Sequence, residues 1–90
     1  MSRASKIRAR LMETLQPQEC LVTDESALHV GHPGAASGGG HFRIRLVAAQ
    51  FEGQNRLARH RLVYHYLNDM MHSEIHALAL VALAPSEIPD

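Results

Sequence analysis

The sequence predicts an α+β fold: a two-layer sandwich in which a three-stranded mixed sheet carries helices on one face. Three observations predict it. An apolar stripe at helical spacing opens the chain, a strand-like alternation follows in the middle, and the most apolar run lies near the end. The expected order is helix, strand, strand, helix or helix pair, and strand, in one domain over residues 1–90.

The first helix is predicted from apolar residues that recur at steps of three and four. These residues are Ala4, Ile7, Leu11 and Leu15. Ser2 is placed to cap this helix and Pro17 to stop it. Residues 19–25 are then predicted to form a first strand that contains Cys20.

Residues 26–40 are predicted to form a flexible loop without regular structure. The segment is rich in residues that break helices and strands, namely Gly31, Pro33, Gly34, Ser37, Gly38, Gly39 and Gly40. A loop this long in a small domain is typically either functional or disordered.

The second strand has the clearest period-two pattern in the chain. Its core face is expected to hold Phe42, Ile44, Leu46 and Ala48, and its other face Arg43, Arg45 and Val47. A turn over residues 51–55 follows, and Asn55 can cap a helix that runs to about residue 72 with a break near Leu67. The apolar face of that helix is expected to hold Leu57, Val63, Tyr64, Leu67 and Met71, with His60 in its middle as a core histidine.

The third strand is predicted over residues 75–83. It is apolar on both faces and is therefore expected to be well covered. Pro85 ends it and begins a short last turn. The segment from 41 to 83 is long enough for a right-handed crossover between parallel strands.

The composition argues against an enzyme. Ninety residues leave room for one modest core and little room for a deep substrate cleft. No Gly-x-Ser-x-Gly element is present, and neither predicted helix holds a pair of carboxylates at helical spacing. The lone Cys20 cannot form an internal disulfide, which favours a reducing compartment, and the opening Met1-Ser2-Arg3 is typical of a cytoplasmic protein.

Seven histidines against one cysteine make imidazole the candidate metal donor. His76 lies at the mouth of the third strand, where it would be held rigidly as a metal ligand or would be a strand-edge histidine bonded to a backbone carbonyl. His29 and His32 lie in the loop, as metal donors or as solvated side chains. A complete zinc site is not expected, because no Cys-x-x-Cys is present. The favoured metal hypothesis is a partial site that a partner completes.

Several short elements, in this order along the chain, resemble the BolA family. They are Asp24-Glu25-Ser26, His41-Phe42, Phe51-x-Gly53, Arg59-His60-Arg61-x-Val63-Tyr64 and Ile75-His76-Ala77-Leu78, and they span almost the whole chain. The resemblance implies an α-β-β-α-α-β arrangement similar to a class II KH domain. It also implies a non-enzymatic adaptor in iron–sulfur cluster assembly, trafficking or iron sensing.

The resemblance further implies a partner and a cofactor. The partner is a monothiol glutaredoxin with a Cys-Gly-Phe-Ser motif, and the pair shares a [2Fe–2S] cluster that glutathione also helps to hold. The chain alone is expected to be a monomer without a cluster. His76 in His-Ala-Leu would be one ligand, and His29, three residues after Ser26, would be the second. His32 is the alternative loop ligand, because this loop carries extra residues.

Two other functions remain open at this point. The first is a DNA-binding transcriptional regulator with a KH-like basic surface, carried by Arg43, Arg45, Arg56, Arg59 and Arg61. The formal net charge of zero and the lack of a Gly-x-x-Gly loop count against it. Arg59 and Arg61 would otherwise be solvated or pair with Glu52 or Asp69. The second is a protein-interaction domain that binds no metal.

Overall fold

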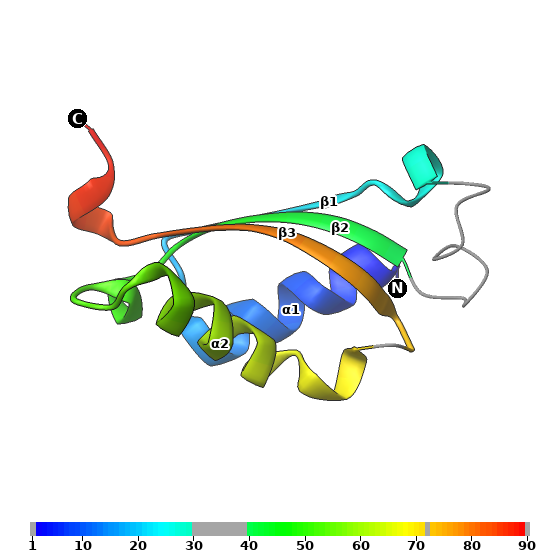
Figure 1. Ribbon diagram of the computed structural model, residues 1–90, viewed down its shortest axis with the longest axis horizontal. Coiled ribbons are helices and arrows are strands. Elements are labelled where there is room, and N and C mark those ends of the chain that lie inside the picture. The colour runs from blue at the N-terminus through cyan, green and yellow to red at the C-terminus, as the bar shows by residue number, and fades with distance from the viewer. Residues whose placement is uncertain (1, 30–39, 72, 90) are drawn as a thin grey trace.

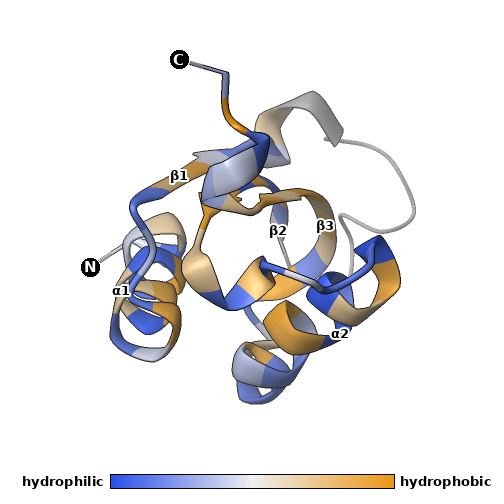
Figure 2. Ribbon diagram, turned by 90° about the vertical axis from the view of Figure 1, so that its left-hand side faces the viewer, coloured by the Kyte–Doolittle hydropathy of each residue, from blue (hydrophilic) through white to orange (hydrophobic). Residues whose placement is uncertain are grey.

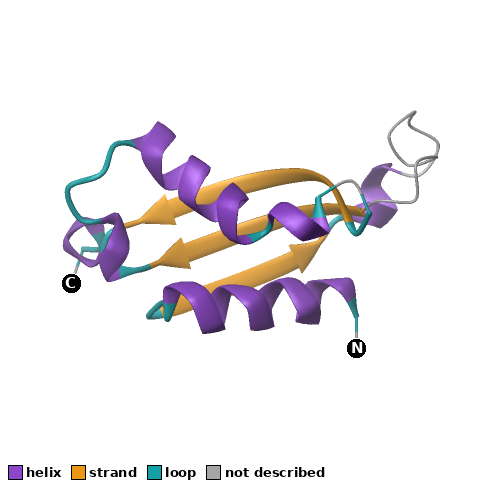
Figure 3. Cartoon of the chain, turned by 90° about the horizontal axis from the view of Figure 1, so that it is seen from below, coloured by secondary structure: helices purple, strands orange, loops and turns teal. Residues whose placement is uncertain are grey.

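The fold follows the predicted two-layer plan. A computed structural model describes residues 2–29, 40–71 and 73–89. Its main elements are α1 (Arg3–Leu15), β1 (Glu19–Asp24), β2 (Gly40–Val47), α2 (Arg56–Tyr66) and β3 (Ile75–Leu83). Both helices cover the same face of the three strands (Figure 1), and the view from below shows them crossing that face side by side (Figure 3). The predicted α+β fold is therefore confirmed.

The three described strands form a mixed sheet in the order β1-β2-β3. β1 pairs antiparallel with β2, and β2 pairs parallel with β3. The parallel pair confirms the predicted crossover, and α2 lies within it. As a result β2 and β3 begin at the same end of the sheet, where β1 ends because Asp24 pairs with Phe42.

The first helix begins and ends where its sequence indicates. The Ser2 hydroxyl accepts a hydrogen bond from the Ser5 N–H at 3.1 Å, which satisfies one of the free donors of the first turn. The helix ends at Leu15, and Gln16 follows in the left-handed region at φ 49°. The predicted stripe is confirmed, since Ile7, Leu11 and Leu15 are buried and Ala4 packs against them.

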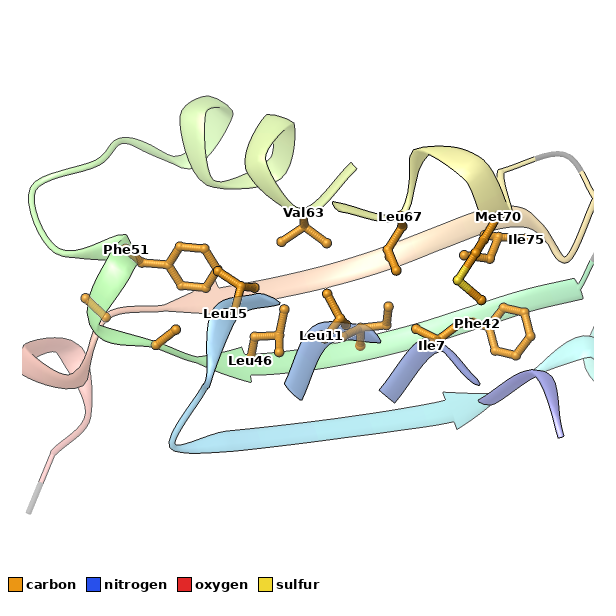
Figure 4. Packing of buried hydrophobic residues seen from close by; sticks show 13 residues of the cluster. Ile7, Leu11, Leu15, Phe42, Leu46, Phe51, Val63, Leu67, Met70 and Ile75 are labelled. Carbon is orange, nitrogen blue, oxygen red and sulfur yellow. The ribbon is translucent and has the colours of Figure 1, made fainter. Parts of the chain in front are cut away.

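The core lies between the sheet and the two helices (Figure 4), where orange hydrophobic residues also gather in the end-on view (Figure 2). The core-facing residues predicted for β2 are all buried. Val47, predicted to lie on the other face of the strand with Arg43 and Arg45, is buried as well. It lines a small hollow with Pro85 and Ile88, so the last turn of the chain covers the end of the strand.

The second helix begins as predicted, and its predicted apolar face is buried in part, at Val63 and Leu67. The Asn55 side chain accepts a hydrogen bond from the Ala58 N–H at 2.8 Å. The α-helix ends at Tyr66, and a 3-10 turn over Asn68–Met70 follows, which confirms the expected break. Leu57 and Tyr64 are 57% and 38% exposed, contrary to prediction. The tighter turn changes the phase of the side chains, so Met70 enters the core.

Two further expectations need correction. β3 is not covered on both faces, because the sheet carries α1 and α2 on one side only and Val81 remains 42% exposed. The segment 26–40 is not structureless throughout, because Ser26–His29 forms a 3-10 turn and Gly40 belongs to β2. The rest of that loop, including His32, lies outside the described residues. Among the described residues, no helix has both the length and the apolar character needed to cross a bilayer.

Candidate metal centre

His76 lies at an irregularity where β3 joins the sheet. Gly40 pairs with Ile75 and His41 pairs with Ala77, so the strand register skips His76, which is an extra residue on β3. A bulge of this kind bends the strand and re-aims a side chain. His76 is exposed, although it opens the apolar strand β3. Its side chain therefore lies at the surface of the protein.

A second imidazole, that of His41, lies beside His76. The centroids of the two rings are 5.1 Å apart, and the ring planes are tilted by 47°. His41 is half-buried at the start of β2, on the sheet face opposite Phe42. In the sequence, His41 was recognised only as part of a family signature and was not predicted to be a metal donor. The predicted topology already indicated that His41 and His76 would lie close together, because a parallel crossover brings the starts of both strands to the same end of the sheet.

The Asp24-Glu25-Ser26 element fixes the backbone around His41. The Ser26 hydroxyl accepts a hydrogen bond from the His41 N–H at 3.1 Å, and the Glu25 N–H donates to the His41 carbonyl at 2.8 Å. The Ser26 N–H donates to the Asp24 carboxylate at 2.9 Å. Hydrogen bonds from the Ser26 side chain and backbone lower the pKa of Asp24. These contacts attach the Ser26–His29 turn to the start of β2.

Gly40 is needed at this junction because of close packing. A Cβ at this position would lie 2.7 Å from the Phe42 ring and 2.8 Å from the Ser26 hydroxyl. Either contact is closer than van der Waals radii allow, so a side chain would displace the serine that holds His41. The Gly40 N–H also donates to the Glu74 carbonyl at 3.1 Å, which ties the start of β2 to the residue before β3.

The structure describes the other predicted metal donors to different extents. His29 ends the 3-10 turn, so its backbone lies at the same end of the sheet as His41 and His76, while its side chain is not among the described parts. Within the described residues, no three His, Cys, Asp or Glu side chains are grouped to hold a metal ion. Cys20 is half-buried in β1 as predicted, and burial raises the pKa of its thiol. A neutral, half-buried thiol is a poor metal ligand.

A shallow hollow of about 410 Å³ lies on the open sheet face next to His41. Ala77 and Ala79 contribute its small side chains, and Glu25 and Arg43 contribute charged groups. Because the alanine side chains are short, they protrude little from the surface beside His41. A side chain or loop from another protein could therefore reach this end of the sheet.

Three of the five arginines predicted as candidates for contacting nucleic acid form ion pairs with carboxylates. Arg43 pairs with Glu25 at 3.0 Å, and Arg45 pairs with Glu19 at 3.3 Å. Arg59 pairs with Glu87 and is only 11% exposed, whereas the sequence predicted a solvated side chain or a pair with Glu52 or Asp69. Asp69 pairs with Arg10 instead. Arg56 and Arg61 are exposed, as expected for solvated residues.

Arg59 joins three parts of the chain. Its Nε donates to the Gln54 carbonyl at 2.8 Å, and its Nη1 donates to the Ala82 carbonyl at 3.0 Å and to the Glu87 carboxylate. Its guanidinium carbon also lies 5.9 Å from the centre of the Phe51 ring. His60, predicted to be a core histidine, is half-buried beside Arg59 in a separate hollow.

The contacts of Glu87 predict a pH-dependent contribution to stability. The Ala84 N–H and the Arg59 guanidinium hydrogen-bond the carboxylate, which lowers the pKa of Glu87. A carboxyl with a lowered folded-state pKa stabilises the fold above its unfolded pKa of about 4.3, and this stabilisation is lost as the pH falls through the folded value. We therefore expect Glu87→Gln to lower the free energy of unfolding at pH 7 and to have less effect below about pH 3.5. Urea denaturation at both pH values measures this.

Glu13→Gln is the matched control, since Glu13 is an exposed carboxylate on α1. It should change the free energy of unfolding little at either pH. An equal loss of stability at both pH values in Glu87→Gln would show that the ionised carboxylate does not support the last turn.

The comparisons with known proteins agree on one family. The family model described as BolA-like protein matches residues 11–87. The chain is 41% identical over 91 residues to the Arabidopsis thaliana protein named BOLA1, chloroplastic; the match covers 98% of this chain and 57% of that protein. It is 33% identical over 87 residues to a Haemophilus influenzae protein named DNA-binding transcriptional regulator BolA, with 97% and 82% covered.

A solved structure extends this likeness to the fold. The BolA domain of SufE1 from Arabidopsis thaliana has a TM-score of 0.85 and 40% sequence identity, and the match covers 98% of each chain. This chain thus spans little more than half of the chloroplastic relative and nearly all of the solved domain.

Proposed function

The chain belongs to the BolA family, and from this premise we propose that it is a non-enzymatic adaptor that shares a [2Fe–2S] cluster with a monothiol glutaredoxin. The observation that carries the proposal is the position of His76. Its exposed imidazole lies at the irregular start of β3, at the end of the sheet where the Ser26–His29 turn is attached. In this proposal His76 is one ligand, and His29 or His32 is the second.

The donors at this end of the sheet fit one half of a shared cluster. No three potential donors are grouped within the described residues, and in this proposal the other ligands come from the loop, as His29 or His32, from the partner's cysteine and from glutathione. The short side chains of Ala77 and Ala79 leave room for a partner to approach this end of the sheet. Two imidazole ligands in place of thiolates raise the reduction potential of such a cluster, as in Rieske centres. Because protonated imidazole cannot ligate, cluster retention would also depend on pH.

This chemistry suits transfer or sensing of a cluster. A cluster held across two proteins is released when either protein leaves. Neutral histidine ligands on one iron give that side a pH-sensitive attachment. We therefore propose a role in cluster trafficking or iron sensing. A cytoplasmic location and a monomeric state for the chain alone stay predictions.

DNA binding is the second candidate, and the name of the Haemophilus influenzae relative favours it. The described surface supports it less well. Arg43 and Arg45 are paired with glutamates on the open sheet face, and Arg59 is enclosed. Arg56 and Arg61 are left as exposed candidates on α2, on a chain of zero formal net charge. A protein that binds through two phosphate contacts would bind DNA weakly and lose affinity only gently with salt.

Anaerobic reconstitution tests the leading proposal. The chain is mixed with a monothiol glutaredoxin, glutathione, iron and sulfide, and visible absorption, circular dichroism and native mass are recorded. We expect a heterodimer with one copy of each chain and a spectrum that differs from that of the glutaredoxin homodimer. A spectrum identical to glutaredoxin alone at every mixing ratio would contradict cluster sharing.

A salt titration of DNA binding separates the two functions. The same preparation without glutaredoxin is titrated with duplex DNA between about 50 and 200 mM salt, a range in which a protein with many phosphate contacts loses affinity by orders of magnitude. We expect weak binding with a shallow dependence on salt. Tight binding with a steep salt slope would favour the transcriptional regulator.

A further inference from the structure

The two histidines of neighbouring strands are arranged as a pair that can chelate one ion. His41 and His76 come from β2 and β3, and their ring centroids are 5.1 Å apart. Zinc binds an imidazole nitrogen at about 2.0–2.1 Å, which places the ion about 3.2 Å from the centre of the ring. Two rings that share one ion at a tetrahedral angle therefore have centres about 5.2 Å apart. The observed separation already matches this value.

The orientation of the rings and the support of the backbone agree with this arrangement. The ring planes are tilted by 47°, whereas in a parallel stack the nitrogens of the two rings would not converge on one point. Hydrogen bonds from Ser26 and Glu25 hold the backbone of His41, so the point from which this ring extends is fixed. His76 lies at the register shift, so its ring extends from the irregular start of β3.

We propose that His41 and His76 form a two-imidazole site that binds a divalent transition-metal ion in the chain alone. Imidazole nitrogens select ions such as Zn²⁺, Ni²⁺ and Cu²⁺, and water fills the remaining positions. The inference shares His76 with the proposed function but does not depend on a cluster or on glutaredoxin. It assigns a metal-binding role to His41, which the sequence analysis did not.

Metal titration of the isolated chain tests the proposal. Zn²⁺ binding is measured by calorimetry, and Cu²⁺ is used as a second probe because its electron paramagnetic resonance spectrum reports bound imidazole nitrogens. We expect one ion for each chain and two nitrogens on Cu²⁺. Loss of a residue that only supports a metal ligand typically costs about 10- to 100-fold in affinity, so His41→Ala and His76→Ala should each weaken Zn²⁺ binding at least about tenfold.

Three further variants make the result specific. His65→Ala removes an exposed histidine on α2 and should leave Zn²⁺ affinity unchanged. The double variant His29→Ala/His32→Ala should keep the two-nitrogen Cu²⁺ spectrum. His41→Gln replaces His41→Ala if the alanine variant does not give a cooperative thermal unfolding transition.

Unchanged Zn²⁺ affinity in a folded His41 variant would overturn the proposal. So would loss of the two-nitrogen signal in the loop double variant alone, since the site would then belong to the loop histidines. Neither result bears on cluster sharing, which is measured only with glutaredoxin present.

Discussion

If the chain shares a cluster with glutaredoxin as proposed, His76→Ala is expected to abolish the visible circular dichroism signal of that cluster. In the proposed centre His76 is a direct ligand, so its removal leaves one iron a ligand short and the heterodimer without its bridging cluster. Because His76 is exposed, its replacement should change the free energy of unfolding by no more than about 0.5 kcal/mol. Anaerobic reconstitution with glutaredoxin and glutathione, followed by a thermal unfolding curve, measures both effects.

Single loop variants complete this test. We expect one of the two variants His29→Ala and His32→Ala to lose the circular dichroism signal and the other to keep it, because the proposal requires one loop ligand. His65→Ala is the control for the loss of any exposed histidine and should leave the spectrum intact. A wild-type spectrum in folded His76→Ala would remove His76 from the centre and would leave the cluster proposal without its main support.

The parts of the fold that depend on neighbours in sequence were predictable. The caps at Ser2 and Asn55 need only a side-chain oxygen a few residues before a free N–H, and both hydrogen bonds are present. The bounds of β3 follow from the apolar run over residues 75–83 and from Pro85, and the strand has these bounds. Each of these features is decided within a few residues of the chain.

The parts that depend on the packing of distant segments were not predictable in the same way. Leu57 was placed in the core from its position on a helical wheel, but it lies at the exposed start of α2, and the 3-10 turn after the helix brings Met70 into the core instead. β3 was expected to be covered on both faces because its residues are apolar, yet both helices lie on one side of the sheet. Periodicity reports which residues are apolar but not how many layers cover them.

The candidate site shows the same division. His76 was identified from the sequence, but its closeness to His41 depends on the register of two strands whose starts are 35 residues apart, with a shift at that point. The enclosure of Arg59 was also hidden, because its partners Gln54, Ala82 and Glu87 come from three different segments. An arginine in an Arg-His-Arg element looks solvated until those segments are brought together.

Arg59→Ala is expected to destabilise the fold by about 1–3 kcal/mol. Arg59 donates to the Gln54 and Ala82 carbonyls and to the Glu87 carboxylate while only 11% exposed. Its removal leaves the part-buried Ala82 carbonyl without this donor, whereas water can replace the donor at Gln54 and Glu87, and an unsatisfied acceptor costs about 1–3 kcal/mol. The free energy of unfolding from urea denaturation at pH 7 measures the loss, and Arg61→Ala is the matched control, since Arg61 is exposed two residues further along α2.

The same pair of variants decides how the Arg59-His60-Arg61 element is used. If it served nucleic acid, both alanine variants would weaken DNA binding alike and leave stability nearly unchanged. If Arg59 supports the fold, Arg59→Ala should lower stability by several times more than Arg61→Ala, and Arg59→Lys should recover only part of the loss. A lysine keeps the charge but lacks the planar set of donors that reaches two carbonyls and a carboxylate at once. Equal, small effects of Arg59→Ala and Arg61→Ala on stability would contradict the structural role and return Arg59 to the candidate basic surface.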